Sequence, residues 1–318
     1  KRQFSTDGSD HLTVLTAFQE WKRMRQQKGD KAAQFFLREN FLSRLTLFQM
    51  EDLRRQFSDL LKEIGFLPRD YRVTSSRGKG RKPDTTPKPN VADANSSNMA
   101  LVKAVLCAGL YPNIIVAPRN LVGAGRGEKE AGECAFQSAK GEAYLHPCTV
   151  SFSQRKLESR YCCYHDMVKT KKTYVRDCTT VSEFALLLFG GSLKVYHVRG
   201  IVTIDDWLKF RIGAKAATLV KHLRAQMERM LLKKILNPQE DITKSEEGKA
   251  LIEAVSTLLE REKTTIPDGA DIVTPWTAGE RGPSRGRGGR GRGSSRGGRG
   301  RGGRGGRSGR SRRDDDRT

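Results

Sequence analysis

The chain has 318 residues, 36% of them hydrophobic, and a formal net charge of +23 at pH 7. This length is enough for two or three domains of about 100–150 residues each. The charge is uneven: residues 281–318 contain 14 arginines, 14 glycines and three aspartates and carry +11, while the other 280 residues carry +12. This composition excludes both a wholly disordered and a purely globular protein. It argues against basic partners and indicates nucleic acid or an anionic surface.

Several classes of protein are disfavoured by what the sequence does not contain. It has no run of about 18 apolar residues and no signal-peptide stretch, so we expect no membrane partner. Its six cysteines form no Cys-x-x-Cys pair, so we expect no metal site and reduced thiols in the cytoplasm or nucleus. The first residues, Lys1-Arg2-Gln3, predict a fragment or a processed piece.

The first third of the chain has helical periodicity. A possible cap at Ser9 or Asp10 precedes apolar residues at helical spacing, and a second apolar stripe follows at residues 35–42. A third stripe runs from Leu47 to Ile64 and stops at Gly65. Residues 69–98, rich in Pro, Ser, Thr and basic residues, predict a basic flexible insertion, after which a helix follows from Met99.

The middle of the chain has the pattern of short strands. Six β-rich stretches separated by polar or glycine turns predict a small barrel or sandwich. They are residues 114–116, 143–145, 161–164, 173–175, 193–196 and 201–204. Two amphipathic helices follow, one interrupted at Asn237-Pro238 and one centred on residues 251–259. The fold class is therefore α+β, with a low-complexity tail.

No catalytic constellation is present. The segment Gly123–Lys129 resembles a phosphate loop only in its glycine content and lacks the Lys-Ser/Thr pair that would reach phosphate and Mg²⁺. We therefore expect it to be a solvated hairpin loop. His146 and His165 are expected to be half-buried barrel residues when composition alone is considered.

Several segments, taken together and in this order, resemble a known family. They are Ser9-Asp10-His11-Leu12-Thr13, Ala17-Phe18, Trp21, Asn40-Phe41-Leu42, residues 103–112, His146-Pro147, Tyr164-His165, residues 174–179 and Leu188-Phe189-Gly190-Gly191. In order and spacing, residues 9–235 resemble the C-terminal half of a DEAH/RHA-type ATP-dependent RNA helicase, in the branch similar to RNA helicase A.

The resemblance implies a domain layout. Residues 9–113 would be a helical ratchet domain and residues 114–212 an oligonucleotide-binding (OB) fold. The basic insertion at 69–98 and the Arg-Gly-Gly tail lie outside the core that the family shares. From the residues themselves we expect C-terminal helices at 213–262 and a disordered tail at 275–318. In the family, RecA-like lobes bind ATP and Mg²⁺. This chain lacks those lobes, so we expect no cofactor in it. The lobes of the parent chain and an activating protein are the protein partners that the family implies.

The candidate RNA-binding residues combine charge with an aromatic side chain. The barrel segment offers Arg119, His146, Lys169, Thr170, Lys171, Lys172, Tyr174 and Arg176. An OB fold binds single strands through a basic groove and aromatic stacking. Strand alternation favours Val175 as the core residue and an outward position for Tyr174 and Arg176; the alternative is a Tyr174 that faces the barrel interior. The alternative for the lysine run is a charged strand edge that prevents aggregation.

Two further sets of residues complete the candidate site. Asp10 and His11, at the start of the ratchet helix, are expected to face a phosphate, with a simple helix cap as the alternative. Arg287, Arg296, Arg301 and Arg304 each begin an Arg-Gly-Gly unit. These arginines predict sequence-tolerant RNA binding, with a solubilising tail as the alternative.

The sequence therefore predicts the part of an ATP-dependent RNA helicase that holds single-stranded RNA. Two rival functions remain: a free-standing RNA-binding adaptor without ATPase lobes, and a protein-interaction module. The upstream gene sequence discriminates enzyme from adaptor, because only a helicase continues into a phosphate loop and an acidic box.

Overall fold

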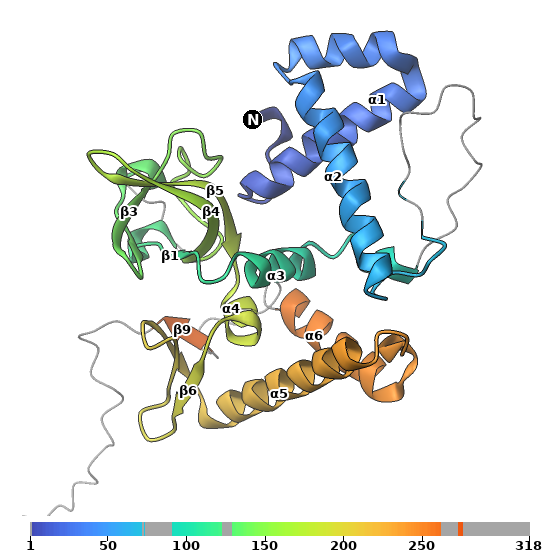
Figure 1. Ribbon diagram of the computed structural model, residues 1–318. Helices are drawn as coiled ribbons and strands as arrows, with labels where there is room; N and C mark the ends of the chain where they lie inside the picture. The colour runs from blue at the N-terminus through green and yellow to red at the C-terminus, as the bar shows by residue number, and fades with distance from the viewer. Residues whose placement is uncertain (1, 72, 74–90, 123–128, 262–272, 276–318) are drawn as a thin grey trace, which may run out of the picture. The chain divides into compact units, whose positions relative to one another are not determined.

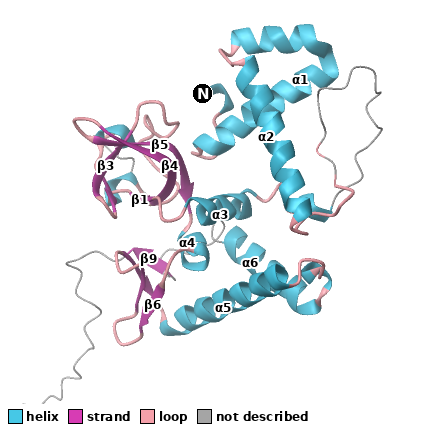
Figure 2. Ribbon diagram, in the orientation of Figure 1, coloured by secondary structure: helices cyan, strands magenta, loops and turns pink. Residues whose placement is uncertain are grey.

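A computed structural model describes residues 2–71, 73, 91–122, 129–261 and 273–275 (Figure 1). All of these lie in one compact unit, Lys1–Ala278. Most of the expected insertion at 69–98, the glycine loop at 123–128 and the four tail arginines lie outside the described residues. The α+β class is confirmed, as the helices and strands of Figure 2 show.

Two helices begin the fold. α1 (Asp10–Glu39) is capped by Ser9, whose Oγ accepts a hydrogen bond from the Leu12 N–H at 3.0 Å. Gly29 interrupts this helix with φ 82°, a conformation that side chains disfavour, and the chain turns there. α2 (Arg44–Glu63) confirms the third apolar stripe, and Gly65 follows it with φ 77°. The two helices share a core that includes Phe18, Trp21 and Leu47.

A closed five-stranded barrel follows the helix α3 (Met99–Leu110). Its strands are β1 (Ile114–Val116), β2 (Phe136–Ser138), β3 (Gly141–Leu145), β4 (Tyr161–Lys169) and β5 (Thr173–Val181). The strand order is β1-β2-β3-β5-β4; β3 and β5 run parallel, and the other described pairs are antiparallel. Apolar side chains fill the interior, among them Ile115, Phe136, Leu145 and Val175. The predicted OB barrel is thereby confirmed.

The last two expected strands do not belong to this barrel. They are β6 (Leu193–Tyr196) and β7 (Ile201–Ile204), which form a second sheet with β8 (Leu208–Ile212) and β9 (Val273–Pro275) in the order β6-β7-β8-β9. The reason is the helix α4 (Glu183–Phe189), which leaves the barrel directly after β5. Ser182 caps α4, and Leu186 and Leu187 are fully buried in a second core.

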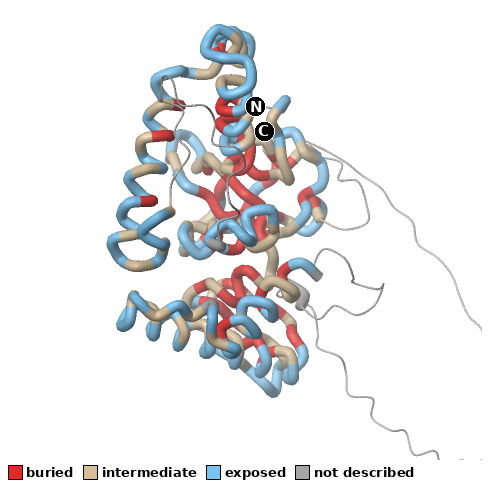
Figure 3. The backbone as a smooth tube through the Cα atoms, turned by 90° about the vertical axis from the view of Figure 1, so that its right-hand side faces the viewer, coloured by how far each residue is buried: buried red, intermediate tan, exposed pale blue. Residues whose placement is uncertain are grey.

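Two long helices follow the second sheet. They are α5 (Ala214–Leu236) and α6 (Glu246–Arg261), and they share a core with α3, α4 and the sheet. Five short 3₁₀ helices complete the described elements: Arg2–Phe4, Val91–Asp93, Arg119–Leu121, Ala131–Glu133 and Ile242–Lys244. Figure 3 shows buried positions inside these elements and exposed positions on their outer sides. The expected domain bounds remain predictions.

Among the described residues, no helix combines the length and the apolar character that crossing a membrane requires.

Candidate nucleic-acid interface

Strands β3 and β5 bring two tyrosines together on the outside of the barrel. Their parallel pairing puts Tyr144 opposite Tyr174 and Leu145 opposite Val175. Val175 is fully buried, and side chains alternate along a strand, so both tyrosines point away from the interior. Their ring centroids are 6.4 Å apart at 52°. The outward orientation predicted for Tyr174 therefore agrees with the burial of Val175.

Three polar side chains surround these rings. His146, directly after β3, lies edge-on to Tyr174 with centroids 6.0 Å apart. Arg176 Nη2 lies 3.4 Å from His146 Nε2, and Lys172 Nζ lies 4.2 Å from the centroid of the Tyr144 ring. We call Tyr144, His146, Lys172, Tyr174 and Arg176 the Tyr144–Tyr174 surface. It combines two aromatic rings with the basic side chains of Lys172 and Arg176, which is the chemistry of a single-strand binding site.

The hairpin between β4 and β5 extends this surface. Lys169 pairs with Thr173, and the Thr170 N–H donates to the Lys172 carbonyl at 2.9 Å, which forms the turn. Lys169, Thr170 and Lys171 are exposed at its tip. The predicted lysine run therefore stands beside the two tyrosines, where its charges face water.

Arg119 lies in another part of the barrel. It follows β1, whose last residue, Val116, pairs with Tyr161 at the start of β4, whereas Lys169 ends that strand. The nine residues of β4, at about 3.3 Å each, separate the two positions. Burial lowers the pKa of Arg160, and the nearby charge of Arg119 lowers it further. The structure thus does not bring Arg119 to the Tyr144–Tyr174 surface.

Asp10 and His11 lie at the junction between α1 and the barrel. Asp10 is only 1% exposed, and its two carboxylate oxygens accept the N–H groups of Val150 and Cys178, each at 3.0 Å. His11 Nδ1 lies 2.7 Å from Thr179 Oγ1. Buried polar groups are normally paired in this way. Direct contact between the Asp10 side chain and RNA has no support in this geometry.

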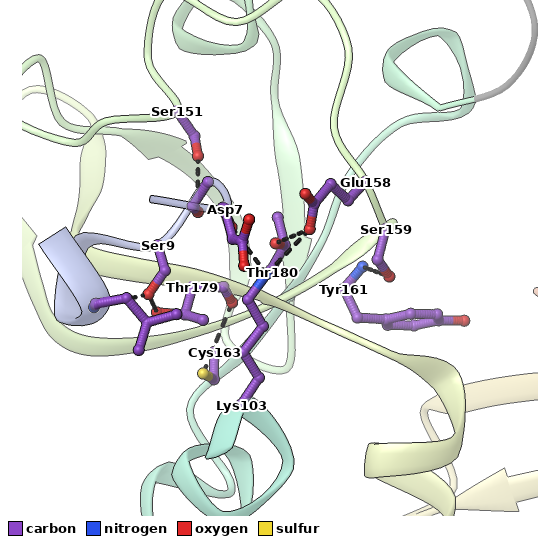
Figure 4. A network of polar contacts seen from close by, with 12 residues as sticks. Asp7, Ser9, Lys103, Ser151, Glu158, Ser159, Tyr161, Cys163, Thr179 and Thr180 are labelled. Atoms are coloured by element: carbon purple, nitrogen blue, oxygen red, sulfur yellow. Dashed lines mark hydrogen bonds and ion pairs between the residues drawn. The ribbon is translucent and has the colours of Figure 1, made fainter. Parts of the chain in front are cut away.

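Further hydrogen bonds connect residues 7–9 to the barrel and to α3, as Figure 4 shows. Ser9 Oγ and Thr179 Oγ1 are 2.7 Å apart, and Ser151 Oγ donates to the Gly8 carbonyl at 3.2 Å. The buried Lys103 of α3 donates to the Asp7 carbonyl at 2.8 Å and to Glu158 Oε2 at 3.0 Å. The junction is therefore a hydrogen-bonded unit of α1, α3 and the barrel.

The cysteines form no disulfide, and only Cys148 is exposed. Burial raises the pKa of Cys163 to about 12 and raises the pKa of Cys107, Cys162 and Cys178 as well. Thiols with raised pKa values are poor nucleophiles at neutral pH. In the described ranges, no three metal-ligating side chains lie close enough to hold an ion.

Sequence reasoning missed Tyr144. The strand at residues 143–145 was predicted, and alternation alone would have turned Tyr144 outward. Its place beside Tyr174 depends on the parallel pairing of two strands that are 30 residues apart, and no local pattern encodes that pairing.

Comparison with known proteins agrees with this fold. Residues 102–193 match a family model described as an oligonucleotide/oligosaccharide-binding fold, and residues 200–261 match one described as the C-terminal domain in RNA helicases. The first match contains all five barrel strands, and the second contains β7, β8, α5 and α6.

Several curated proteins are similar over most of the chain. DExH-box ATP-dependent RNA helicase DExH1 of Arabidopsis thaliana is 35% identical over 265 residues, which is 83% of this chain and 24% of that protein. Putative ATP-dependent RNA helicase DHX57 of Mus musculus is 33% identical over 286 residues, covering 81% of this chain and 20% of that protein. ATP-dependent DNA/RNA helicase DHX36 of Homo sapiens is 32% identical, covering 81% and 24%.

The chain thus spans about a quarter or less of the length of these relatives. Its barrel and its C-terminal helices are the parts that the two family models describe. The chain belongs to the family of DExH-box RNA helicases, of which it contains the OB-fold and C-terminal domains.

Proposed function

We propose that this chain holds single-stranded RNA on the Tyr144–Tyr174 surface, as the RNA-binding part of an ATP-dependent helicase. The observation that carries the proposal is the pair of outward tyrosines, with Lys172 beside Tyr144 and Arg176 beside His146. Exposed aromatic rings stack on bases, whatever the base, while cations bind the phosphates between them. Such a surface holds a strand without reading its sequence, as a translocating helicase requires.

The hairpin lysines and the tail would add sequence-independent affinity. Lys169 and Lys171 extend the positive charge beyond the two rings, so a strand stacked on Tyr174 would lay its phosphates along the hairpin. The tail arginines Arg287, Arg296, Arg301 and Arg304 offer charge and stacking planes on a glycine-rich chain.

ATP hydrolysis would take place in RecA-like lobes outside this chain. The sequence contains no Gly-x-x-x-x-Gly-Lys-Ser/Thr loop, which is the motif that would bind the nucleotide phosphates. The lobes would supply phosphoryl-transfer chemistry, and the residues of this chain would bind and orient the strand. We therefore expect no RNA-stimulated phosphate release by the purified chain alone.

The apolar side of α2 is the surface on which the ATPase lobes would pack. Leu53, Phe57, Leu60 and Ile64 are exposed along this helix, with Phe57 60% exposed. A groove of about 410 Å³ beside them is lined by Met50, Leu53, Arg54, Phe57, Ser58, Leu61, Leu67, Tyr71 and Val73. Contiguous exposed apolar patches normally mark interaction sites. The ATPase lobes are the occupant that we propose.

Substitution of Tyr174 tests the proposed RNA surface. Tyr174→Ala should weaken the binding of a single-stranded oligonucleotide by about 1–3 kcal/mol, because one stacking ring is lost, and should leave the melting temperature unchanged. Tyr196→Ala is the matched control, because Tyr196 is an exposed tyrosine of the second sheet. Lost stability with unchanged affinity per folded molecule would make Tyr174 a structural residue and refute the proposal.

A further inference from the structure

A buried carboxylate joins the two backbone segments that carry the Tyr144–Tyr174 surface. Asp10 Oδ2 accepts the Cys178 N–H, two residues after Arg176, and Asp10 Oδ1 accepts the Val150 N–H, four residues after His146. Asp10 belongs to α1, outside the barrel. We propose that Asp10 is a positioning residue, which sets the spacing between His146 and Arg176 and thereby the shape of the RNA surface. This inference rests on the proposed function.

On β5, the contact coincides with an irregularity in the strand. Asp177 has φ 51°, a left-handed conformation that is uncommon for residues other than glycine. The pairing of β4 with β5 skips this position: Tyr164 is opposite Cys178 and Asp166 is opposite Arg176. The irregular residue precedes the amide that donates to Asp10 and follows Arg176. The hydrogen bond to Asp10 therefore fixes the backbone next to Arg176, which determines where the Arg176 guanidinium points.

On the other side, Asp10 holds the end of a tight turn. The His146 carbonyl accepts the Thr149 N–H at 2.9 Å and the Thr149 hydroxyl at 3.0 Å. The Cys148 N–H donates to His146 Nδ1 at 3.2 Å, which fixes the orientation of the ring. Val150, the next residue after Thr149, is tied to Asp10. The imidazole thus belongs to a turn whose far end is anchored on α1.

The carboxylate suits this task because it accepts at both oxygens. An asparagine of the same shape keeps one acceptor, but its NH₂ group would face a backbone N–H, so one of the two segments would be released. The released segment would carry either His146 or Arg176 away from the position that the carboxylate sets. RNA affinity should then fall in molecules that are still folded.

The test compares Asp10→Asn with Lys103→Met in the full chain. Both substitutions break buried contacts of the same junction, but Lys103 bonds to Asp7 and Glu158 and not to either segment of the surface. At about 300 mM salt, where counterion-driven binding is weak, Asp10→Asn should weaken RNA binding about tenfold per folded molecule. Lys103→Met should change it less than about twofold.

A double-mutant cycle distinguishes positioning from general damage. In a chain that already carries His146→Ala and Arg176→Ala, Asp10→Asn should cost less than about twofold in affinity, because nothing remains to be positioned. An equal tenfold loss in that background, or wild-type affinity for Asp10→Asn, would overturn the inference. If Tyr174→Ala leaves binding unchanged, the proposed function fails whatever Asp10→Asn does.

Hydrogen exchange of the unaltered chain provides a readout that does not depend on whether the variant folds. If the bonds to Asp10 favour RNA binding, bound RNA must favour those bonds by the same factor. Saturating single-stranded RNA should therefore slow exchange of the Val150 and Cys178 amides more than that of the Gly190 amide, which bonds to Leu186. Unchanged exchange at both amides would also overturn the inference.

Discussion

Phe41 occupies a position at which glycine is normally favoured. The Leu42 N–H donates to the Leu37 carbonyl and the Phe41 N–H to the Arg38 carbonyl, which is the Schellman pattern at the end of α1. Phe41 occupies the left-handed position of this motif, with φ 52°, and it is 97% exposed. The residue therefore adds conformational strain without burying its ring.

Phe41→Gly should consequently stabilise the chain. Relief of left-handed strain gains about 1–2 kcal/mol, from which the larger chain entropy of unfolded glycine subtracts up to about 1 kcal/mol. Urea unfolding should show a higher midpoint at the same slope. Phe41→Val is the counterpart, because a β-branched residue is more strained at this position, and it should lower the midpoint. A fall in stability for Phe41→Gly would mean that the phenyl ring makes stabilising contacts.

The buried thiols make stability depend on alkaline pH. Burial raises the pKa of Cys163 to about 12, whereas the pKa of an unfolded cysteine is about 8.5. Below the unfolded value both states bind the proton and the stabilisation is complete. As pH rises toward 12, only the unfolded state releases it, so stability falls by about 1.4 kcal/mol per pH unit for this thiol. Urea unfolding from pH 8 to 10.5 should show this fall, with a shallower slope in Cys163→Ala. Identical slopes would contradict the raised pKa.

At the residue scale, the sequence predicted the orientation of side chains where the alternation along a strand determines it. The burial of Val175 and the outward position of Tyr174 follow from the two-residue period of a strand. The partners of Asp10 did not follow, because Val150 and Cys178 are 140 and 168 residues away along the chain. The sequence Ser9-Asp10 is equally consistent with a cap, and Ser9 is the residue that caps α1.

Gly190 and Gly191 lie where several elements pack together. These elements are α3, α4, α5 and the second sheet. The Asp205 carboxylate accepts the Ser192 N–H at 2.7 Å and the Tyr111 hydroxyl, and Arg224 Nη2 of α5 donates to the Gly190 carbonyl at 2.6 Å. A Cβ at Gly191 would lie 2.1 Å from Asp205 Oδ2. The Phe-Gly-Gly segment of the sequence is therefore a packing requirement.

Gly191→Ala should cost about 1–3 kcal/mol, because the methyl group displaces the carboxylate that holds Ser192 and Tyr111. Gly109→Ala is the matched control: it lies in α3 with nothing within 4 Å of its added Cβ. That substitution should stabilise the chain by up to about 1 kcal/mol, as alanine does within helices. Thermal or urea unfolding measures both. Equal effects of the two substitutions would contradict the packing argument.

Strong periodicity predicted the elements that form locally. The stripes of α2, α5 and α6 and the apolar run of β1 were each recognised. α4, β2 and β8 were missed: α4 is only seven residues long, and β2 and β8 lack the continuous apolar run of β1. The assignment of β6 and β7 to the barrel was wrong because strand patterns do not specify which sheet a strand joins. That choice depends on α4, which separates β5 from β6 along the chain.

At the scale of the whole molecule, the charge of residues 281–318 should dominate the salt dependence of RNA binding. For single strands the logarithm of affinity falls by about 0.7 for each neutralised phosphate per tenfold rise in salt. Deleting residues 281–318, which carry +11, should therefore flatten this dependence and weaken binding to every RNA. Charge reversal at Lys171 and Lys172 in the full chain should flatten it less. A slope unchanged by the deletion would mean that the tail does not contact RNA.

The central claim is that the Tyr144–Tyr174 surface holds the strand, and zero-length ultraviolet cross-linking of the full chain tests it most directly. A single-stranded RNA stacked on these rings should cross-link within peptides that contain Tyr144, His146 or Tyr174, and mass spectrometry identifies the residue. Tyr174→Ala should abolish its own cross-link while leaving the chain folded. Cross-links confined to α2, to the second sheet or to the tail, with none on β3 or β5, would contradict the account.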